Sequence, residues 1–197
     1  MPYLGPLPPD THPDLEETFA TYQRLLGYTP STILIMQRRP RLVKALAQMA
    51  SAVWDPAGEV DTGLKRLLAY MASRTHGCAY SMAHSAEAAH RAGVSDEKIA
   101  AILDYRTSPL FTDAERVAIE FAVAAASQPN AVTEAHFVRM RRHWNEGQIV
   151  EIAGVVALNG FLNRWNDTMA PQLEREPLAF ATTHLAAQGW KPGKHQG

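Results

Sequence analysis

Apolar side chains that recur at helical spacing constrain the fold of this chain most, and the clearest such apolar stripe lies within residues 64–72. Its members fall at i, i+3, i+4, i+7 and i+8, as on a helix with one buried face: Leu64, Leu67, Leu68, Met71 and Ala72. Residues 148–169 are apolar around nearly the whole circumference, so we expect that helix in the centre of the core or in a subunit interface. No alternating strand pairs or hairpin turns occur. The sequence therefore predicts an all-α fold.

The length of 197 residues suits a single domain, residues 1–197, with a sizeable core. Residues 1–12 hold four prolines and are expected to form an extended arm. Residues 171–197 are a weakly patterned tail, which Trp190 should anchor. Residues 32–36 are a short apolar run with no strand to pair with, which favours a short helix. Capping residues mark four later helix starts, at Ser95, Thr112, Thr133 and Asn145.

Charge, hydropathy and cysteine content limit the kinds of binding partner and the cellular location that we expect for the chain. Lys and Arg number 19 and Asp and Glu 20, and the net charge of -1 gives no reason to expect a nucleic acid or an anionic membrane as partner. No apolar run reaches the roughly 18 residues that cross a bilayer, and residues 1–5 lack the features of a signal peptide. A single cysteine is typical of a reducing compartment. We therefore expect a cytoplasmic protein.

The only cysteine stands at a break between two predicted helices. Gly77 interrupts the first helical pattern, and residues 79–92 follow with good helix formers. Cys78 is therefore predicted at a helix N-terminus, where unpaired N–H groups and the helix dipole stabilise a thiolate. Ser81 lies about one turn further on, and His84 one turn beyond that. Six residues rise about 9 Å along a helix, so a relay through the Ser81 hydroxyl or a water would have to join thiol and imidazole.

Each of these side chains also has an ordinary structural interpretation. A lone cysteine such as Cys78 is often a small buried hydrophobe, and a helical histidine such as His84 is often part of a satisfied core or surface. The Ser81 hydroxyl can bond a carbonyl oxygen one turn back. Tyr80 is either a second acid or part of the wall of the site, and packing is favoured.

No metal ion or other cofactor is predicted. The histidines of this region lack the carboxylate or cysteine partners of a metal site: His76, His84 and His90. Four basic residues are expected to be a solvated face rather than an anion site: Arg38, Arg39, Arg41 and Lys44. Four polar residues on the late apolar helix either line the site or form a buried ion pair that fixes helix packing: Asn163, Arg164, Asn166 and Asp167.

Several segments resemble one known family. The run from Ser73 to His84, continuing through residues 93–99, is similar to the core motif of the alkylhydroperoxidase D / carboxymuconolactone decarboxylase-like family. Residues 108–112 and 161–167 resemble later parts of the same family, so the resemblance covers most of residues 40–170. It implies an alkylhydroperoxidase D-like helical bundle that assembles as a homo-oligomer, as a dimer, trimer or hexamer.

The chain departs from the peroxidase members at three points. Ser81 occupies the position of the second cysteine in their Cys-x-x-Cys pair, and Ser85 occupies the later of two histidine spacings. No acidic residue lies between Thr62 and Gly77, so the family's proton-relay glutamate is absent or is supplied from elsewhere, for example by a neighbouring subunit. With one cysteine no intramolecular disulfide can form, and a two-cysteine peroxidase cycle is excluded.

Three functions remain open from the sequence. In the first, Cys78 is the reactive thiol of a one-cysteine, peroxiredoxin-type oxidoreductase that reduces hydroperoxides. His84 transfers the proton through Ser81, and an external thiol or protein reductant then reduces the oxidised cysteine. In the second, which the decarboxylase branch implies, His84 and Tyr80 perform acid–base chemistry on a small organic acid. In the third, the chain is an inactive oligomeric scaffold of the same fold. The candidate catalytic residues are thus Cys78, Ser81, His84 and Tyr80.

Overall fold

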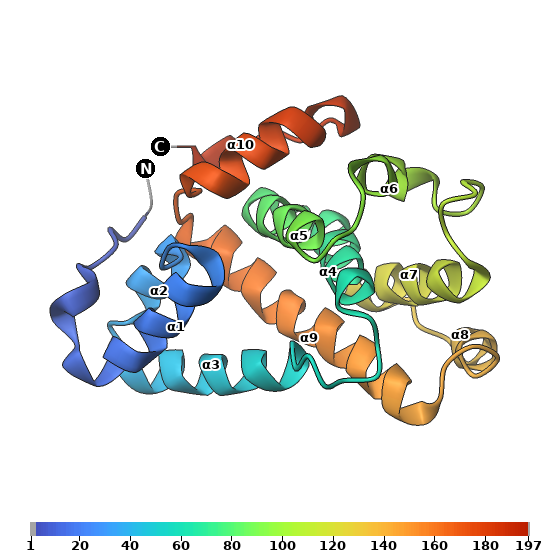
Figure 1. Cartoon of the computed structure of the whole chain (residues 1–197), viewed down its shortest axis with the longest axis horizontal. Helices are drawn as coiled ribbons and strands as arrows, with labels where there is room; N and C mark the ends of the chain where they lie inside the picture. The colour runs from blue at the N-terminus through green and yellow to red at the C-terminus, as the bar shows by residue number, and fades with distance from the viewer. Residues whose placement is uncertain (1–2, 197) are drawn as a thin grey trace.

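The computed structural model describes residues 3–196 and contains ten α-helices and no strand within them (Figure 1). The all-α prediction is therefore confirmed. The helices are α1 (Glu16–Leu26), α2 (Ser31–Met36), α3 (Pro40–Val53), α4 (Thr62–His76), α5 (Ala79–Arg91), α6 (Asp96–Ala100), α7 (Asp113–Ala126), α8 (Glu134–Met140), α9 (Glu146–Met169) and α10 (Arg175–His184). In the part of the chain described, none of these helices is both long and apolar enough to cross a membrane.

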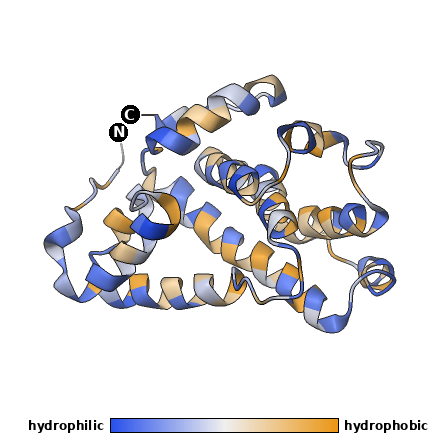
Figure 2. Ribbon diagram, viewed as in Figure 1, coloured by the Kyte–Doolittle hydropathy of each residue, from blue (hydrophilic) through white to orange (hydrophobic). Residues whose placement is uncertain are grey.

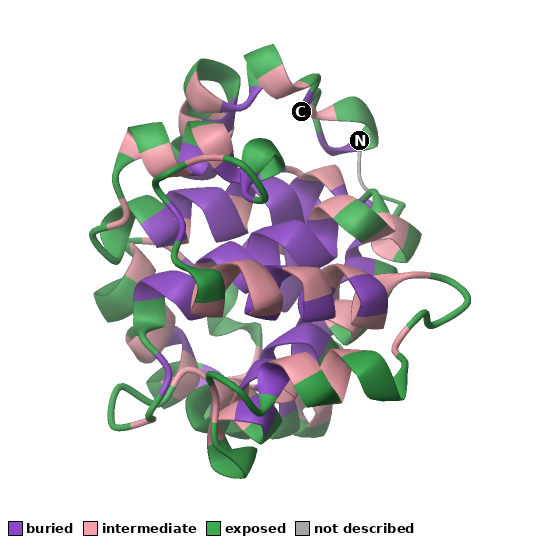
Figure 3. Cartoon of the chain, turned by 90° about the vertical axis from the view of Figure 1, so that its right-hand side faces the viewer, coloured by how far each residue is buried: buried purple, intermediate pink, exposed green. Residues whose placement is uncertain are grey.

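Helices α4, α5 and α9 form the centre of the molecule. Helix α4 packs against α5, α7 and α9, and α10 covers α5. Buried residues gather in the middle of the molecule (Figure 3), and many of them belong to these three helices. The stripe predicted from residues 64–72 is buried, with Leu67 and Leu68 at most 1% exposed. Because α4 contacts a neighbour on several sides, ten of its 15 residues are buried, more than a single face would supply.

Helix α9 crosses the molecule and joins two hydrophobic clusters. One side packs on α4 and α7 through Ile152 and Val155, while Leu158 belongs to a second cluster formed by α1, α2 and α3. Apolar positions recur along α9 (Figure 2), in agreement with the predicted central helix. Two of its apolar residues are nevertheless exposed, Val150 and Phe161.

The predicted helix starts agree with the structure. Ser95 caps α6, and the side chains of Thr112 and Asn145 form capping boxes at α7 and α9. Thr133 is the N-cap residue of α8, and its backbone N–H donates to His136 Nδ1 at 3.1 Å. The short apolar run forms α2, as expected. Local rules suffice at these positions because a cap and its partner lie within one turn of each other.

An ion pair between a buried lysine and a partly exposed glutamate ties α4 to α9. Lys65 Nζ lies 2.7 Å from Glu151 Oε2, and the lysine side chain is 2% exposed. Glu151 also accepts hydrogen bonds from the backbone N–H groups of Glu59 and Val60. The carboxylate therefore neutralises the lysine and fixes the loop before α4 at the same time.

The two ends of the chain are more ordered than the sequence suggests. The prediction of an extended arm is wrong for residues 9–11, which form a 3-10 turn, and residues 1–2 lie outside the described residues. In the tail, Trp190 Nε1 donates to the Ala79 carbonyl oxygen at 3.0 Å, which confirms the predicted anchor. Helix α10 and the 3-10 turn Gly193–His195 bring the tail over α5. Because of this placement, residues of the tail contribute to the candidate site around Cys78.

Candidate functional site

Cys78 is the N-cap residue of α5, as the sequence predicts. Gly77 ends α4 with a φ of 86°, a left-handed conformation that glycine adopts without strain, and the chain turns there into α5. The backbone N–H of Cys78 donates to the Ser73 carbonyl oxygen at 3.0 Å, which fixes the turn. The cysteine side chain is fully buried, at 0% exposure.

A chain of buried hydrogen bonds holds the thiol in place. Cys78 Sγ donates to Ser81 Oγ at 3.3 Å, and Ser81 Oγ in turn accepts from Asn166 Nδ2 at 3.1 Å. Asn166 Oδ1 accepts from the Thr32 hydroxyl at 2.7 Å. The contact between Cys78 and Ser81 thus agrees with the predicted spacing, but the described network leads from Ser81 to α9 and α2 and not to His84.

The thiol is protonated at neutral pH. Burial raises the pKa of Cys78 to about 11, and the nearby Asp167 carboxylate also raises it, while hydrogen bonding to Ser81 acts in the opposite direction. The expectation that the helix N-terminus holds a thiolate is therefore wrong for this closed site. Desolvation of the sulfur outweighs the helix dipole, whose effect is typically below about 1 kcal/mol at exposed positions.

His84 is paired with a carboxylate that the sequence did not suggest. Its Nε2 lies 2.7 Å from Glu174 Oε2, and its Nδ1 lies 3.4 Å from the Tyr28 hydroxyl. Glu174 is the N-cap residue of α10, in the tail. A carboxylate of the same chain, from beyond the motif, therefore contacts His84. No local pattern could have revealed this, because 90 positions separate the two residues.

Tyr80 belongs to the same cluster. Its hydroxyl donates to Glu174 Oε1 at 2.9 Å, and its ring lies 4.4 Å from that of His84, centroid to centroid. Burial and the neighbouring Glu174 raise the pKa of Tyr80 well above its ordinary value, so the phenol keeps its proton. The expected packing role and a hydrogen-bonding role are both present.

Glu174 is ionised despite its burial. Desolvation by itself would raise its pKa, but the charge and hydrogen bond of His84 and the backbone N–H of Ser31 together lower it. The cluster therefore combines a carboxylate, an imidazole and a neutral phenol. This is a set of groups that can hold and move a proton.

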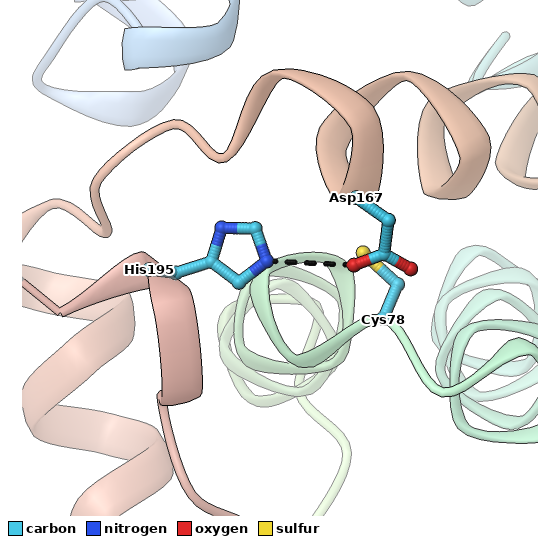
Figure 4. Close-up of side chains that lie close together, drawn as sticks. All are labelled: Cys78, Asp167 and His195. Carbon is cyan, nitrogen blue, oxygen red and sulfur yellow. Dashed lines mark ion pairs between the residues drawn. The ribbon is translucent and has the colours of Figure 1, made fainter. Parts of the chain in front are cut away.

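A second cluster surrounds the thiol (Figure 4). It consists of the side chains of Cys78, of Asp167 on α9 and of His195 in the tail. Each side chain has one potential metal-ligand atom, and these three atoms lie within 4.8 Å of one another. His195 Nε2 lies 3.5 Å from Asp167 Oδ1. The two clusters are adjacent, because the His195 ring lies 5.5 Å from the Tyr80 ring, centroid to centroid.

The polar residues of the late helix divide between two locations. Asn166 and Asp167 line the site, one through Ser81 and the other beside the thiol. Asn163 and Arg164 instead line an open, largely apolar groove of about 680 Å³, bounded also by Phe121 and Phe161. Cys78 is not among the residues that line this groove. His195 was missed altogether, because it lies in the weakly patterned tail.

Comparisons with known proteins agree with this architecture. Residues 40–124 match the carboxymuconolactone decarboxylase family. The uncharacterized protein YnjA of Escherichia coli (strain K12) is 38% identical over 85 residues, which are 43% of this chain and 46% of that protein. The match therefore spans about half the length of this curated relative.

Solved structures match over a longer part of the chain. The debrominase Bmp8, as a cysteine-to-alanine variant in complex with 2,3,4-tribromopyrrole, is 32% identical, with a TM-score of 0.85 over 92% of this chain and 96% of Bmp8. The alkylhydroperoxidase D core of a peroxidase-related protein from Ralstonia eutropha JMP134 shares the fold, at 19% identity and a TM-score of 0.75 over 88% of this chain and 90% of that one. The chain thus belongs to the alkylhydroperoxidase D / carboxymuconolactone decarboxylase-like family.

Proposed function

We propose that this protein is a one-cysteine reductase in which Cys78 removes an electrophilic heteroatom from a small organic molecule. The observation that carries the proposal is the position of the only cysteine, at the start of α5, enclosed by polar groups from α5, α9 and the tail. Beside it lies the cluster of Tyr80, His84 and Glu174, which can move a proton. A purely structural cysteine needs neither set of neighbours.

The substrate class that we favour is a halogenated aromatic ring. Bmp8 is a debrominase whose cysteine-to-alanine variant binds 2,3,4-tribromopyrrole, and its likeness to this chain extends over more than nine-tenths of both proteins. The proposed step is balanced: R–Br and Cys78–SH give R–H and Cys78–S–Br. The sulfur forms a bond to bromine and supplies the electron pair, the C–Br bond breaks, and the proton ends on the ring carbon.

The residues around the thiol have distinct roles in this step. His84, oriented by Glu174 and flanked by the Tyr80 phenol, would deliver the proton to the ring. Ser81 and Asn166 would hold the sulfur in position through their hydrogen bonds. Because the chain has one cysteine, an external thiol or protein reductant must then displace bromide from sulfur and reduce the resulting disulfide.

A second candidate is the reduction of hydroperoxides, which the motif around Cys78 favours. Its step is also balanced: R–O–OH and Cys78–SH give R–OH and Cys78–SOH, and an external thiol restores the cysteine. The two candidates use the same sulfur and differ in the atom that it attacks.

A turnover assay separates these functions. The reduced protein is incubated with excess dithiothreitol and either 2,3,4-tribromopyrrole or cumene hydroperoxide, and bromide release and peroxide loss are measured. Bromide release that disappears in Cys78→Ser supports the dehalogenase. Peroxide consumption without bromide release, lost in the same variant, supports the peroxidase instead. Turnover of either compound that survives in Cys78→Ser overturns the proposed role of the thiol.

A further inference from the structure

We infer that Cys78, Asp167 and His195 form a binding site for a zinc ion. The three side chains come from the start of α5, the end of α9 and the C-terminal 3-10 turn, so the fold and not local sequence brings them together. Each offers one ligand atom within 4.8 Å of the other two (Figure 4). A thiolate, an imidazole and a carboxylate are the ligand types that zinc takes in proteins.

The distance between the ligand atoms of Asp167, on α9, and His195, in the tail, fits a shared ion. Bonds of 2.0 to 2.3 Å in a tetrahedral arrangement place two ligand atoms about 3.3 to 3.8 Å apart. The distance between His195 Nε2 and Asp167 Oδ1 is 3.5 Å. Cys78 Sγ lies within 4.8 Å of both of these atoms.

The histidine has the orientation and burial of a metal ligand. His195 is 1% exposed, and its Nδ1 donates to the Pro171 carbonyl oxygen at 2.8 Å. This bond directs Nε2 toward Asp167 and Cys78, yet within residues 3–196 Nε2 has no hydrogen-bond partner. A metal-binding histidine has this arrangement, with its other ring nitrogen held by a carbonyl group.

Charge balance also favours a divalent cation. Zinc binding releases the proton of the thiol, and the resulting thiolate and the carboxylate together carry two negative charges, which the ion neutralises within a buried site. Asp167 has basic neighbours, with Lys194 Nζ 3.5 Å from Oδ1 and His76 Nε2 3.9 Å from Oδ2. Both are partly exposed and can turn toward solvent, whereas His195 cannot.

Such an ion would control the same sulfur that the proposed reductase uses. A zinc-bound thiolate shares its electron pair with the metal, so zinc would protect Cys78 from oxidation and inhibit turnover until a chelator or a competing thiol removes it. The binding site itself does not depend on the proposed function, because metal binding is measured without any substrate.

Cobalt(II) tests the site directly, because a thiolate ligand gives a charge-transfer band in the near ultraviolet. The reduced full-length protein is titrated with Co²⁺, and Zn²⁺ affinity is then measured by competition with a chromophoric chelator. We expect a band that zinc abolishes and that is absent in Cys78→Ser. In Asp167→Asn and His195→Gln, zinc affinity should fall by more than the roughly 10- to 100-fold that loss of an outer-shell partner costs.

Control variants distinguish the loss of a zinc ligand from a general disturbance of the structure. Asp10→Asn and His143→Gln change the same residue types at exposed positions and should leave zinc affinity unchanged. Lys194→Ala removes the contact of the tail with the Asp167 carbonyl oxygen but no ligand, and it should retain the cobalt band. The inference is overturned if Co²⁺ gives no such band, if the band persists unchanged in both ligand variants, or if Lys194→Ala loses zinc as completely as His195→Gln.

Discussion

Glu174 and His84 lie 90 positions apart in the sequence, and their side chains form a hydrogen-bonded pair of 2.7 Å. The pair joins the tail to the helix that begins at Cys78. It therefore places a carboxylate against His84 from within one chain, although this chain has no acidic residue between Thr62 and Gly77. The tail thus contributes a side chain to the candidate site.

Removal of the Glu174 charge should impair proton transfer more than it impairs folding. In Glu174→Gln the amide retains one acceptor for the Tyr80 hydroxyl but no longer provides a carboxylate beside His84 Nε2, and we expect turnover to fall by about 100-fold. The measurement is kcat and KM for bromide release or peroxide loss, with circular dichroism as a check of folding. Glu176→Gln, an exposed change two residues further on, is the control and should have wild-type activity. Equal activity in the two variants would contradict the assigned role.

The pH dependence of Cys78 alkylation should be that of a buried thiol. Because burial disfavours the thiolate, the pKa of about 11 predicts slow alkylation at pH 7 to 8 and a rate that still rises at pH 10. Asp167→Asn removes a charge that raises this pKa, so alkylation at a fixed pH should be faster in that variant. Intact mass after iodoacetamide, with a chelator present throughout, gives the rates. A plateau near the free-cysteine value of about 8.5 would show that the site is open in solution.

The helices were predictable because the signals that specify them are local. The stripe at Leu67 and Leu68, the break at Gly77 and the cap at Ser95 each act within a few residues. The contact between Cys78 and Ser81 was predictable for the same reason, since both residues lie in one helical turn.

The rest of the site depends on tertiary structure. Glu174 and His195 come from a tail without clear periodicity, and the polar positions of α9 allowed either a site or a buried ion pair until the packing of α9 on α5 was known. The protonation of Cys78 was predicted wrongly because the helix dipole can be read from sequence, whereas the extent of desolvation cannot.

Ser81→Cys should restore a disulfide at the start of α5. The sulfur of Cys78 already contacts the side chain of residue 81 at 3.3 Å, so mild oxidation should join the two cysteines. Intact mass should then decrease by two hydrogens, and one thiol pair should become unreactive. Ser85→Cys is the control, because seven residues rise about 10.5 Å along a helix and no disulfide should form with Cys78. Failure of Ser81→Cys to oxidise would contradict the geometry of this helix start.

Glu151→Gln should destabilise the fold, since it leaves the buried Lys65 ammonium without its counter-charge. Breaking one partner of a buried pair costs about 3 kcal/mol, which for a chain of this length lowers Tm by roughly 6 to 12 °C. Thermal unfolding followed by circular dichroism measures the change. Glu146→Gln, whose side chain is 87% exposed, should change the stability by less than about 0.5 kcal/mol. Similar Tm values for both variants would show that Lys65 reaches solvent.

The most direct test of the central proposal is a single turnover without added reductant. Reduced, metal-free protein is mixed with less than one equivalent of 2,3,4-tribromopyrrole, and released bromide is compared with oxidised Cys78 counted by intact mass, since water converts the sulfenyl bromide to sulfenic acid. A one-cysteine dehalogenase predicts a one-to-one ratio of bromide released to cysteine oxidised, and no bromide from Cys78→Ser. Bromide release with Cys78 still reduced would contradict the proposal that this sulfur supplies the electrons.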